Sequence, residues 1–387
     1  MAHTGAFAVD WEERFNMERL RRERLEKAHA AMEKFDVDAL LFLRWENTRY
    51  VSGHRFIAVP TGVCDHPVVC LLPRGGKPIL YTIDMDLTKE KQPWIPEENV
   101  REAYFPEQET GAQGLAEALK RELGADFSGR LGVDTWTAAM YEAIPPAFPK
   151  ARFVNGYEVI MDARMIKTTD EIECLKIAYA ITEAGFQAGI EALRPGVREC
   201  EVQAAIWGRV YSLGAEWTQS AGIVTSDTAP YRRFTSDKII LEGEAVVIDI
   251  GAVFNGYFCD TVRTWFCGLH KKPTPEQKAL FRQSYDALRR AEEAIKPGVT
   301  TGDVYASVQD RILGRLLGHG IGLGGQELPW IAQSPEEAMV IQPGMVFCIE
   351  PFVGKKGLTG IRLEDNVIVT EDGHEVYSTF SFGPLAE

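Results

Sequence analysis

The chain has 387 residues, 45% hydrophobic and 25% charged, which suits a globular protein long enough for two domains. Its formal net charge of −14 argues against nucleic acid and against an anionic membrane surface as partners. No apolar run approaches the roughly 20 residues that cross a bilayer, and the N-terminus lacks the apolar core of a signal peptide. Seven scattered cysteines without a Cys-x-x-Cys pair favour reduced thiols, so we expect a cytoplasmic protein.

Strands and helices alternate in the first part of the chain. Apolar residues at helical spacing within a charged stretch predict a surface helix over 14–35. Further elements are predicted as a helix at 114–123 and short strands at 39–43, 68–72, 78–81, 131–134 and 152–154. This alternation indicates an α/β domain with a mixed sheet, which we place at residues 1–163.

A second domain is predicted at residues 164–387. It begins with a helix for which Thr169 is the expected N-cap, because acidic residues follow in the first turn. Helices are predicted at 169–193, 198–213, 274–294 and 301–317, the last ending at Gly318, and strands with glycine-rich turns follow from 344 to 381. The whole chain is therefore expected to be α/β (α+β), with two domains.

The stretch 246–260 is typical of a β-hairpin. Runs of β-branched and aromatic residues flank Asn255-Gly256, the pair that best tolerates the positive φ angles of a type I′ turn. With this pair as the loop, Phe254 lies opposite Tyr257, and counting back along both strands places Gly251 opposite Asp260.

This register brings two carboxylates together. Side chains alternate faces along a strand, so Asp249 and Asp260 share one face as diagonal neighbours, roughly 7–8 Å apart at their Cβ atoms. Two buried carboxylates at one spot are costly unless a cation lies between them. The alternative is that one aspartate caps a turn while the other faces solvent.

Three further candidates follow the hairpin. His319 stands between two glycines, which let backbone approach a site closely, although a lone histidine is often structural. Glu350 ends a buried strand and needs a partner there. Glu364 shares a face with Arg362, so a plain salt bridge is the alternative to a functional role.

Together these residues suggest a metal site. Four carboxylates and one imidazole form an oxygen-rich set that suits hard cations. One divalent ion would leave two negative charges unbalanced, whereas two divalent ions, roughly 3.5–4 Å apart, would balance the four carboxylates. We therefore expect two divalent metal ions, Mn, Fe or Co with Zn as an alternative. The predicted ligands are Asp249, Asp260, His319, Glu350 and Glu364.

The ordered set resembles the metal-binding pattern of the pita-bread metallopeptidases, which include methionine aminopeptidase, Xaa-Pro dipeptidase, creatinase and ectoine hydrolase. The eleven-residue step between the two aspartates, Arg263-Thr264 and Pro351 also match. The stretches 47–53 and 164–173 resemble the creatinase N-terminal domain and the start of its catalytic domain. The resemblance implies a homodimer in which the neighbour's N-terminal domain helps to close the active site.

The chain departs from the peptidase pattern at two histidines. Where the peptidases carry a histidine upstream of the first ligand, this chain has Tyr231. Where they carry a second histidine after the ligand histidine, this chain has Gln326, followed by Glu327. Neither tyrosine nor glutamine shuttles protons near pH 7 as histidine does.

A second resemblance is to the branch that holds the dimethylsulfoniopropionate lyase of marine bacteria. The stretches 214–218, 343–350 and 363–373 carry it. That lyase has an extra aspartate two residues after the first ligand, where this chain has Gly251, and a catalytic aspartate after the ligand histidine, where Glu327 is the nearest carboxylate. The resemblance therefore extends to the branch and not to each catalytic residue.

The leading hypothesis is a dinuclear-metal-dependent hydrolase that cleaves an amide or C–N bond of a small metabolite or an Xaa-Pro-like dipeptide. Glu350 is the expected proton acceptor and donor, and Tyr231 either supports the developing oxyanion or is a packed aromatic. In the alternative, a metal-dependent lyase, Glu327 would remove a proton alpha to a bound carboxylate.

Candidate substrate-binding residues flank the predicted ligands. Trp217 and Trp330 either line a pocket for a cationic or apolar group or belong to the core. Arg232, beside Arg233, either anchors a substrate carboxylate or is solvated, and Gln326 takes the place of the second histidine. The expected substrate is a small molecule or a short peptide.

Overall fold

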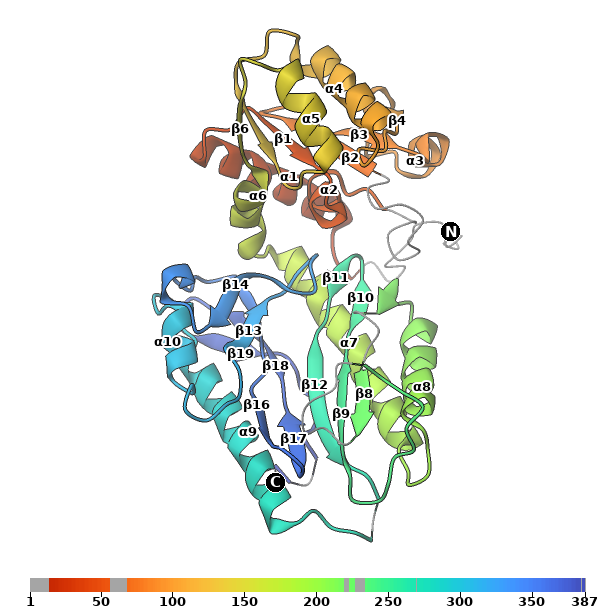
Figure 1. Cartoon of the computed structure of the whole chain (residues 1–387), viewed down its shortest axis with the longest axis vertical. Coiled ribbons are helices and arrows are strands. Elements are labelled where there is room, and N and C mark those ends of the chain that lie inside the picture. Colours follow the sequence, from red (N-terminus) through yellow and green to blue (C-terminus); the bar gives the residue numbers. More distant parts are fainter. Residues whose placement is uncertain are drawn as a thin grey trace. The chain divides into compact units, whose positions relative to one another are not determined.

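The computed structural model describes residues 14–55, 68–218, 223–226, 234–268, 270–383 and 385–386. The chain forms two compact units, Met1–Arg164 (unit 1) and Met165–Glu387 (unit 2), as Figure 1 shows. Among the described helices, none combines the length and the apolar character that a membrane span requires.

Unit 1 is built on a six-stranded sheet with the order β4-β3-β2-β1-β5-β6. Strands β1, β5 and β6 are parallel, whereas β2 runs antiparallel to both β1 and β3, so the predicted mixed sheet is confirmed. The strands are β1 (Ala39–Phe42), β2 (Val68–Pro73), β3 (Ile79–Thr82), β4 (Val100–Glu102), β5 (Arg130–Val133) and β6 (Arg152–Asn155).

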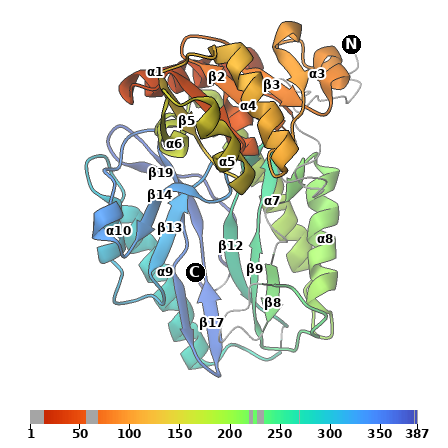
Figure 2. The ribbon, with the colours of Figure 1, turned by 45° about the horizontal axis from the view of Figure 1, so that its top comes forward.

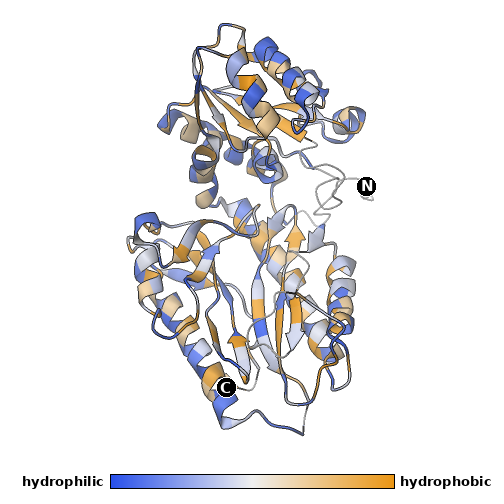
Figure 3. Ribbon diagram, in the orientation of Figure 1, coloured by the Kyte–Doolittle hydropathy of each residue, from blue (hydrophilic) through white to orange (hydrophobic). Residues whose placement is uncertain are grey.

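Helices cover this sheet. They are α1 (Met17–Lys34), α2 (Trp45–Ser52), α3 (Met85–Lys91), α4 (Glu109–Leu123), α5 (Ala138–Ala147) and α6 (Gly156–Met165), with a 3₁₀ turn η2 (Glu97–Asn99). Apolar residues of α4 and α5 pack with Leu41 and Leu71 in one core. Leu40 and Phe42, on the opposite face of β1, are also fully buried. Strand β1 is therefore covered on both faces, which explains why its residues are apolar throughout (Figure 3).

Helix α4 begins five residues before the predicted start at residue 114. The first residues of α4 were not predicted as helical because Gly111 and Gly114 disfavour a helix by themselves. Both glycines are required by close packing. A Cβ atom at Gly111 would lie 2.0 Å from the carbonyl oxygen of Phe105, and one at Gly114 would lie 2.7 Å from the ring of Tyr104.

The stretch 47–53 owes its residue types to contacts within unit 1. Asp134, directly after β5, accepts hydrogen bonds from the backbone N–H groups of Leu43 (2.9 Å) and Arg44 (3.2 Å) at the start of α2, and from the amide of Asn47 (2.8 Å). The hydroxyl of Tyr50 donates to the carbonyl of Ala163 at 3.0 Å. Helix α2 is therefore fixed both to the sheet edge and to the end of α6.

His54, just after α2, should make unit 1 sensitive to acid. Burial, together with the charge of Arg49, lowers its pKa to about 4. The unfolded chain takes up a proton near pH 6.5, whereas the folded chain does so only near pH 4. Stability should therefore fall by up to about 3 kcal/mol as the pH drops between these values.

Peptide-resolved amide exchange of β1 measures this dependence. His54→Gln should flatten it, whereas His29→Gln, on α1, should leave the slope unchanged. An unchanged slope in His54→Gln would contradict the assignment.

Unit 2 contains a five-stranded sheet with the order β14-β13-β15-β18-β19 and two three-stranded sheets with the orders β12-β9-β8 and β11-β10-β7. Strands β16 and β17 form a further two-stranded sheet. Its helices are α7 (Thr169–Ala192), α8 (Glu199–Ser212), α9 (Pro275–Ala294) and α10 (Thr301–Ala306), with the 3₁₀ turn η3 (Pro335–Glu337). Helices α7 and α8 pack against the β9 and β8 side, and α9 packs against β16 and β17, as Figure 2 shows.

The strands of unit 2 are short. They are β7 (Trp217–Thr218), β8 (Ile223–Ser226), β9 (Ala245–Ile250), β10 (Ala252–Phe254), β11 (Tyr257–Phe258), β12 (Thr261–Phe266), β13 (Leu316–Gly320), β14 (Glu327–Ala332), β15 (Val346–Ile349), β16 (Phe352–Lys355), β17 (Thr359–Arg362), β18 (Asp365–Val369) and β19 (His374–Val376).

Two expectations for unit 2 are wrong. The helix predicted over 301–317 ends at Ala306, and β13 begins at Leu316, after Gly314 with its positive φ of 96°, which a helix continuing to residue 317 would not tolerate. The cap of α7 is Thr168 and not Thr169. Its hydroxyl accepts from the N–H of Glu171, whose carboxylate accepts from the N–H of Thr168 in return.

The predicted hairpin register is confirmed. Asn255 and Gly256 both have positive φ, 48° and 79°, and Phe254 lies opposite Tyr257. The same register continues from β10 and β11 into β9 and β12, where Val262 lies opposite Asp249. The chain passes from one small sheet to another at Gly251, within a single hairpin.

Candidate metal centre

The five predicted ligands come from the ends of neighbouring strands. Asp249 lies in β9, Asp260 just before β12, His319 in β13, Glu350 just after β15, and Glu364 between β17 and β18. Strand β15 is paired with β13 on one side and β18 on the other. The N–H of Glu364 donates to the carbonyl of Val262 at 3.0 Å, which joins this sheet to β12.

The side chains meet in the folded unit. His319 Nε2 lies 3.5 Å from Asp260 Oδ2 and 3.6 Å from Glu350 Oε1. The guanidinium of Arg362 reaches Asp249 Oδ2 at 3.3 Å with one nitrogen and contacts Glu350 with the other. Glu364 is fully buried beside the same carboxylates.

The donor atoms of this cluster fit a divalent cation. His319 Nε2, Glu350 Oε1 and both carboxylate oxygens of Glu364 are buried and have no hydrogen-bond partner among the described residues. Leaving buried acceptors without a partner costs free energy, and a cation bound by these atoms removes that cost. The set is rich in oxygen and includes one imidazole, as hard divalent cations prefer.

The backbone prepares His319 for such a role. Its Nδ1 lies 3.0 Å from the carbonyl oxygen of Gly320, so Nδ1 carries the proton and donates it. In the neutral ring this leaves the lone pair on Nε2, which points toward Asp260 and Glu350. A fixed tautomer of this kind is the usual support for a histidine that binds a metal.

Without a cation the cluster retains protons. Burial and the charges of Asp260 and Glu350 raise the pKa of Glu364, and Arg362 opposes them. Burial lowers the pKa of His319, but the neighbouring carboxylates of Asp260 and Glu350 outweigh it, so the net shift is upward. A cation that binds here therefore displaces protons.

Sequence reasoning missed two members of this cluster. A salt bridge between Arg362 and Glu364 was the alternative to a functional role for Glu364, and Arg362 contacts Asp249 and Glu350. The Sγ atom of Cys348 and donor atoms of His319 and Glu364 all lie within 4.8 Å of one another. The available signal was strand periodicity, because Cys348 shares a face with Glu350 two residues later. Burial raises the pKa of Cys348, so it is a neutral thiol here.

Arg263 holds the backbone of Glu364 in place. It is fully buried, and its guanidinium donates to the backbone carbonyl of Glu364, to Asp365 Oδ1 at 3.0 Å and to the carbonyl of Phe380 at 2.9 Å. Its planar fork serves several acceptors at once, which a lysine could not do. The position of Glu364 therefore depends on a buried cation that lies outside the candidate metal site.

Glu327, expected as a base in the lyase alternative, is held in an ion pair. Its Oε1 lies 3.1 Å from Lys167 Nζ, and both side chains are at most 2% exposed. Its Oε2 accepts from the N–H of Gly324 at 3.0 Å. A Cβ atom at Gly322 would lie 2.6 Å from Glu327 Oε1, so glycine is needed there. The pair joins the first residues of unit 2 to the loop after His319.

Removing one partner of this pair should destabilise unit 2. Lys167→Met removes the ammonium group that faces the buried carboxylate of Glu327, and we expect the free energy of unfolding to fall by about 3 kcal/mol. The double variant Lys167→Met/Glu327→Leu should recover most of that loss, since no buried charge remains. Urea denaturation measures both. Equal losses in the single and double variants would contradict this account.

The substrate candidates lie in different surroundings. Trp330 is opposite His319 in the β13–β14 pairing, with ring centroids 6.1 Å apart, and it is half-buried. Trp217, also half-buried, packs edge-on against Phe258 at 6.1 Å. Gln326 is exposed in the loop before β14. The remaining candidates, Tyr231, Arg232 and Arg233, lie outside the described residues.

Comparison with known families divides the chain into two matched regions. Residues 24–166 match the creatinase/prolidase N-terminal domain, and residues 173–371 match metallopeptidase family M24. The second region contains all five members of the predicted ligand set.

Individual relatives match nearly the whole chain. The Xaa-Pro dipeptidase of Pyrococcus furiosus is 30% identical over 366 residues, which is 91% of this chain and 96% of the relative. A Bacillus anthracis Xaa-Pro dipeptidase structure is 27% identical with a TM-score of 0.77, covering 93% of this chain and 98% of that one. The Pyrococcus horikoshii prolidase structure is 26% identical, also with a TM-score of 0.77, at 93% and 99% coverage. The chain therefore belongs to metallopeptidase family M24, the pita-bread metallopeptidases with a creatinase-type N-terminal domain, and is a metal-dependent hydrolase.

Proposed function

We propose that this protein is a dinuclear-metal-dependent hydrolase of the amide bond in short peptides, with Xaa-Pro-like dipeptides as the first substrate class. The observation that carries the proposal is the buried cluster around His319, in which His319 Nε2, Glu350 Oε1 and both carboxylate oxygens of Glu364 have no hydrogen-bond partner among the described residues. The names of the relatives support the substrate class, because those of Pyrococcus furiosus and Pyrococcus horikoshii are Xaa-Pro dipeptidases.

Charge balance supports two metal ions. The cluster contains four carboxylates, and the guanidinium of Arg362 offsets one of their charges. Two divalent ions would leave a small positive excess, which favours the oxyanion that develops during amide hydrolysis. We propose Mn, Fe or Co in these positions, because oxygen ligands predominate.

Asp249, Asp260, His319, Glu350 and Glu364 are the residues that would hold the metal ions. Bound there, they would supply a lowered pKa for the attacking water and polarisation of the substrate carbonyl. Glu350 is suited to proton transfer because its Oε1 is directed at the centre of the cluster. It accepts the proton of the attacking water as the O–C bond forms, and it returns that proton to the leaving nitrogen as the C–N bond breaks.

The residues around the cluster favour a substrate with an apolar part. Trp330 would form one wall beside His319, and Trp217 with Phe258 would form another. Gln326 would contact the substrate from the loop before β14, and Tyr231 and Arg232 would contribute from the segment after β8. The absence of histidine at positions 231 and 326 is expected to restrict the range of dipeptides.

The lyase alternative is less well supported. It requires Glu327 as a general base, yet this carboxylate is buried and paired with Lys167. Both of its oxygens are engaged, Oε1 by Lys167 and Oε2 by the N–H of Gly324, whereas Glu350 Oε1 faces the cluster without a hydrogen-bond partner among the described residues. A positioning role for Glu327 accounts for these contacts without any chemistry of its own.

Two further statements belong to the proposal. Residues 1–163 and 164–387 are proposed as separate domains, with the metal ions bound by the second. The protein is proposed to be cytoplasmic. It is also proposed to be a homodimer, and size-exclusion chromatography with light scattering tests this oligomeric state directly.

The test is a hydrolysis assay of the full chain loaded with Mn or Co. Xaa-Pro dipeptides should release free proline, and matched dipeptides without proline should react more slowly. In heavy-oxygen water, one labelled oxygen should enter the carboxyl product, as hydrolysis requires. An unlabelled product with a new double bond would replace the hydrolase proposal with the lyase. Metal binding without turnover of any dipeptide would exclude the proposed substrates.

A further inference from the structure

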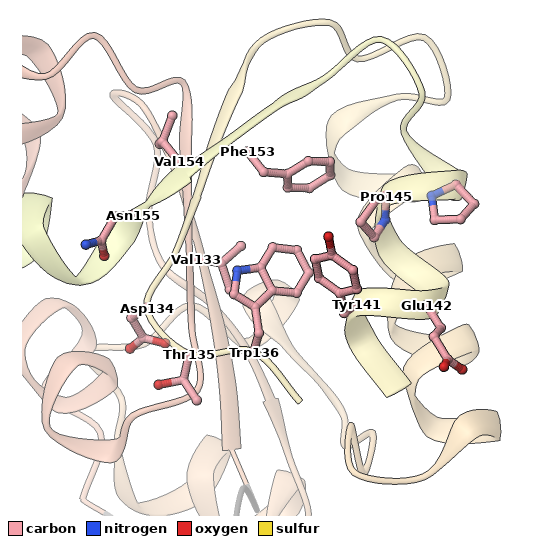
Figure 4. A pocket seen from close by; sticks show the side chains of 11 residues that line it. Val133, Asp134, Thr135, Trp136, Tyr141, Glu142, Pro145, Phe153, Val154 and Asn155 are labelled. Atoms are coloured by element: carbon pink, nitrogen blue, oxygen red, sulfur yellow. The ribbon is translucent and has the colours of Figure 1, made fainter. Parts of the chain in front are cut away.

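Unit 1 contains a pocket that the proposed function does not use. Its volume is about 910 Å³, within the range of pockets that bury small organic molecules. The walls come from the segment after β5, from α5 and from β6 (Figure 4). Strands β5 and β6 are parallel, and the pocket lies toward their carboxyl ends, where α/β sheets usually bind their ligands.

Three aromatic side chains form the centre of this pocket. The rings of Trp136 and Tyr141 are 6.0 Å apart with planes at 79°, and those of Trp136 and Phe153 are 5.5 Å apart at 71°. Figure 4 shows the three rings gathered together. Tyr141 is 70% exposed, so its ring is available at the surface. Nearly perpendicular rings make a corner, as in the aromatic cages that bind organic cations.

The pocket is lined by two carboxyl groups, of which Glu142 supplies the negative charge, because burial raises the pKa of Asp134 to about 7. None of the described lining residues is a lysine or an arginine. The carboxyl group of Asp134 already accepts hydrogen bonds from two backbone N–H groups at the start of α2. Glu142 forms no ion pair with any described residue, so its charge remains available. The same charge disfavours an anionic ligand.

We propose that this pocket binds a small organic cation of the quaternary or primary ammonium class. The ammonium group lies against the faces of Trp136 and Tyr141, whose quadrupoles attract it, and Glu142 supplies the opposite charge at the rim. Phe153 and Pro145 enclose the apolar part of the ligand. The site is independent of the metal cluster and of the proposed hydrolysis.

Choline and its uncharged isostere 3,3-dimethylbutan-1-ol are the probes. Titrated into the full chain, with binding followed by tryptophan fluorescence and calorimetry, choline should saturate a single site. The alcohol, which has the same shape without the charge, should bind at least about tenfold more weakly. Raised salt should weaken the binding of choline and leave that of the alcohol unchanged.

Variants assign the binding to this pocket. Trp136→Leu and the surface variant Tyr141→Leu should each weaken choline binding about tenfold, and Glu142→Gln should weaken it several-fold. Glu98→Gln, an exposed glutamate of η2, is the matched control and should bind as wild type does. Tyr141→Leu keeps the test decisive if Trp136→Leu fails to fold.

Three results would overturn the proposal. Equal binding of choline and the alcohol would show an apolar pocket without cation selectivity. No saturation by choline would exclude the site. A change of oligomeric state in Tyr141→Leu, with choline binding retained, would assign these rings to a contact with a second copy of the chain.

Discussion

Replacing Asp260 by alanine should remove both metal and hydrolysis. Asp260 lies 3.5 Å from His319 Nε2 and faces the centre of the cluster, so its loss removes a shared anionic donor. We expect metal affinity and kcat/KM to fall by more than about 100-fold, the upper end of the loss seen when residues that merely support a metal ligand are changed. Metal content by mass spectrometry and the dipeptide assay measure the two effects.

The variant should retain its fold. The backbone carbonyl of Asp260 accepts from the amide of Asn366 at 2.6 Å, and alanine preserves that contact. Unit 1 should show unchanged amide exchange. Asp286→Ala, an exposed position of α9, is the matched control and should keep full metal content. Retained turnover in Asp260→Ala would end the dimetal proposal.

Replacing Arg263 by methionine should cause the largest loss of stability. The guanidinium is fully buried, lies 4.0 Å from the centre of the Phe382 ring and donates to Glu364, Asp365 and Phe380. Methionine fills part of the volume but leaves these acceptors without a donor. We expect a loss of about 5 kcal/mol, the upper end for a broken buried ion pair.

Urea denaturation and exchange of the β12 and β18 peptides report this loss. Arg290→Met, on the exposed face of α9, is the control and should cost less than about 0.5 kcal/mol. Because Arg263 positions the backbone of Glu364, metal content should also fall in Arg263→Met. A stability within 1 kcal/mol of wild type would refute the proposed role of this network.

Local chemistry made the hairpin predictable from the sequence. Asn255-Gly256 determines the turn, the turn determines the register, and the register places Asp249 and Asp260 on one face. No contact with the rest of the chain is needed for this inference.

The parts that were not predicted depend on distant residues. The first turn of α4 was missed because Gly111 disfavours a helix by itself, and the close approach of Phe105 that requires glycine there is not revealed by sequence spacing. The positive φ of Gly314, which a helix reaching residue 317 would not tolerate, is also a property of the folded backbone, since glycine by itself allows either sign.

The candidate site also has a part that the sequence predicted and a part that it did not. Its carboxylates and histidine were identified from their residue types and order, whereas Arg362 reaches Asp249, 113 positions earlier, where two sheets meet. The ion pair of Glu327 was not predicted, because its partner, Lys167, lies 160 positions earlier. Pairing of this kind depends on tertiary structure, which residue spacing alone does not report.

The guanidinium of Arg362 has a consequence for the charge balance of unit 2. By contacting Asp249 and Glu350, it gives the acidic cluster a counter-charge that belongs to the chain itself. Part of the repulsion between the four carboxylates is therefore offset by a side chain, unlike in zinc fingers, whose folding free energy comes from the ion.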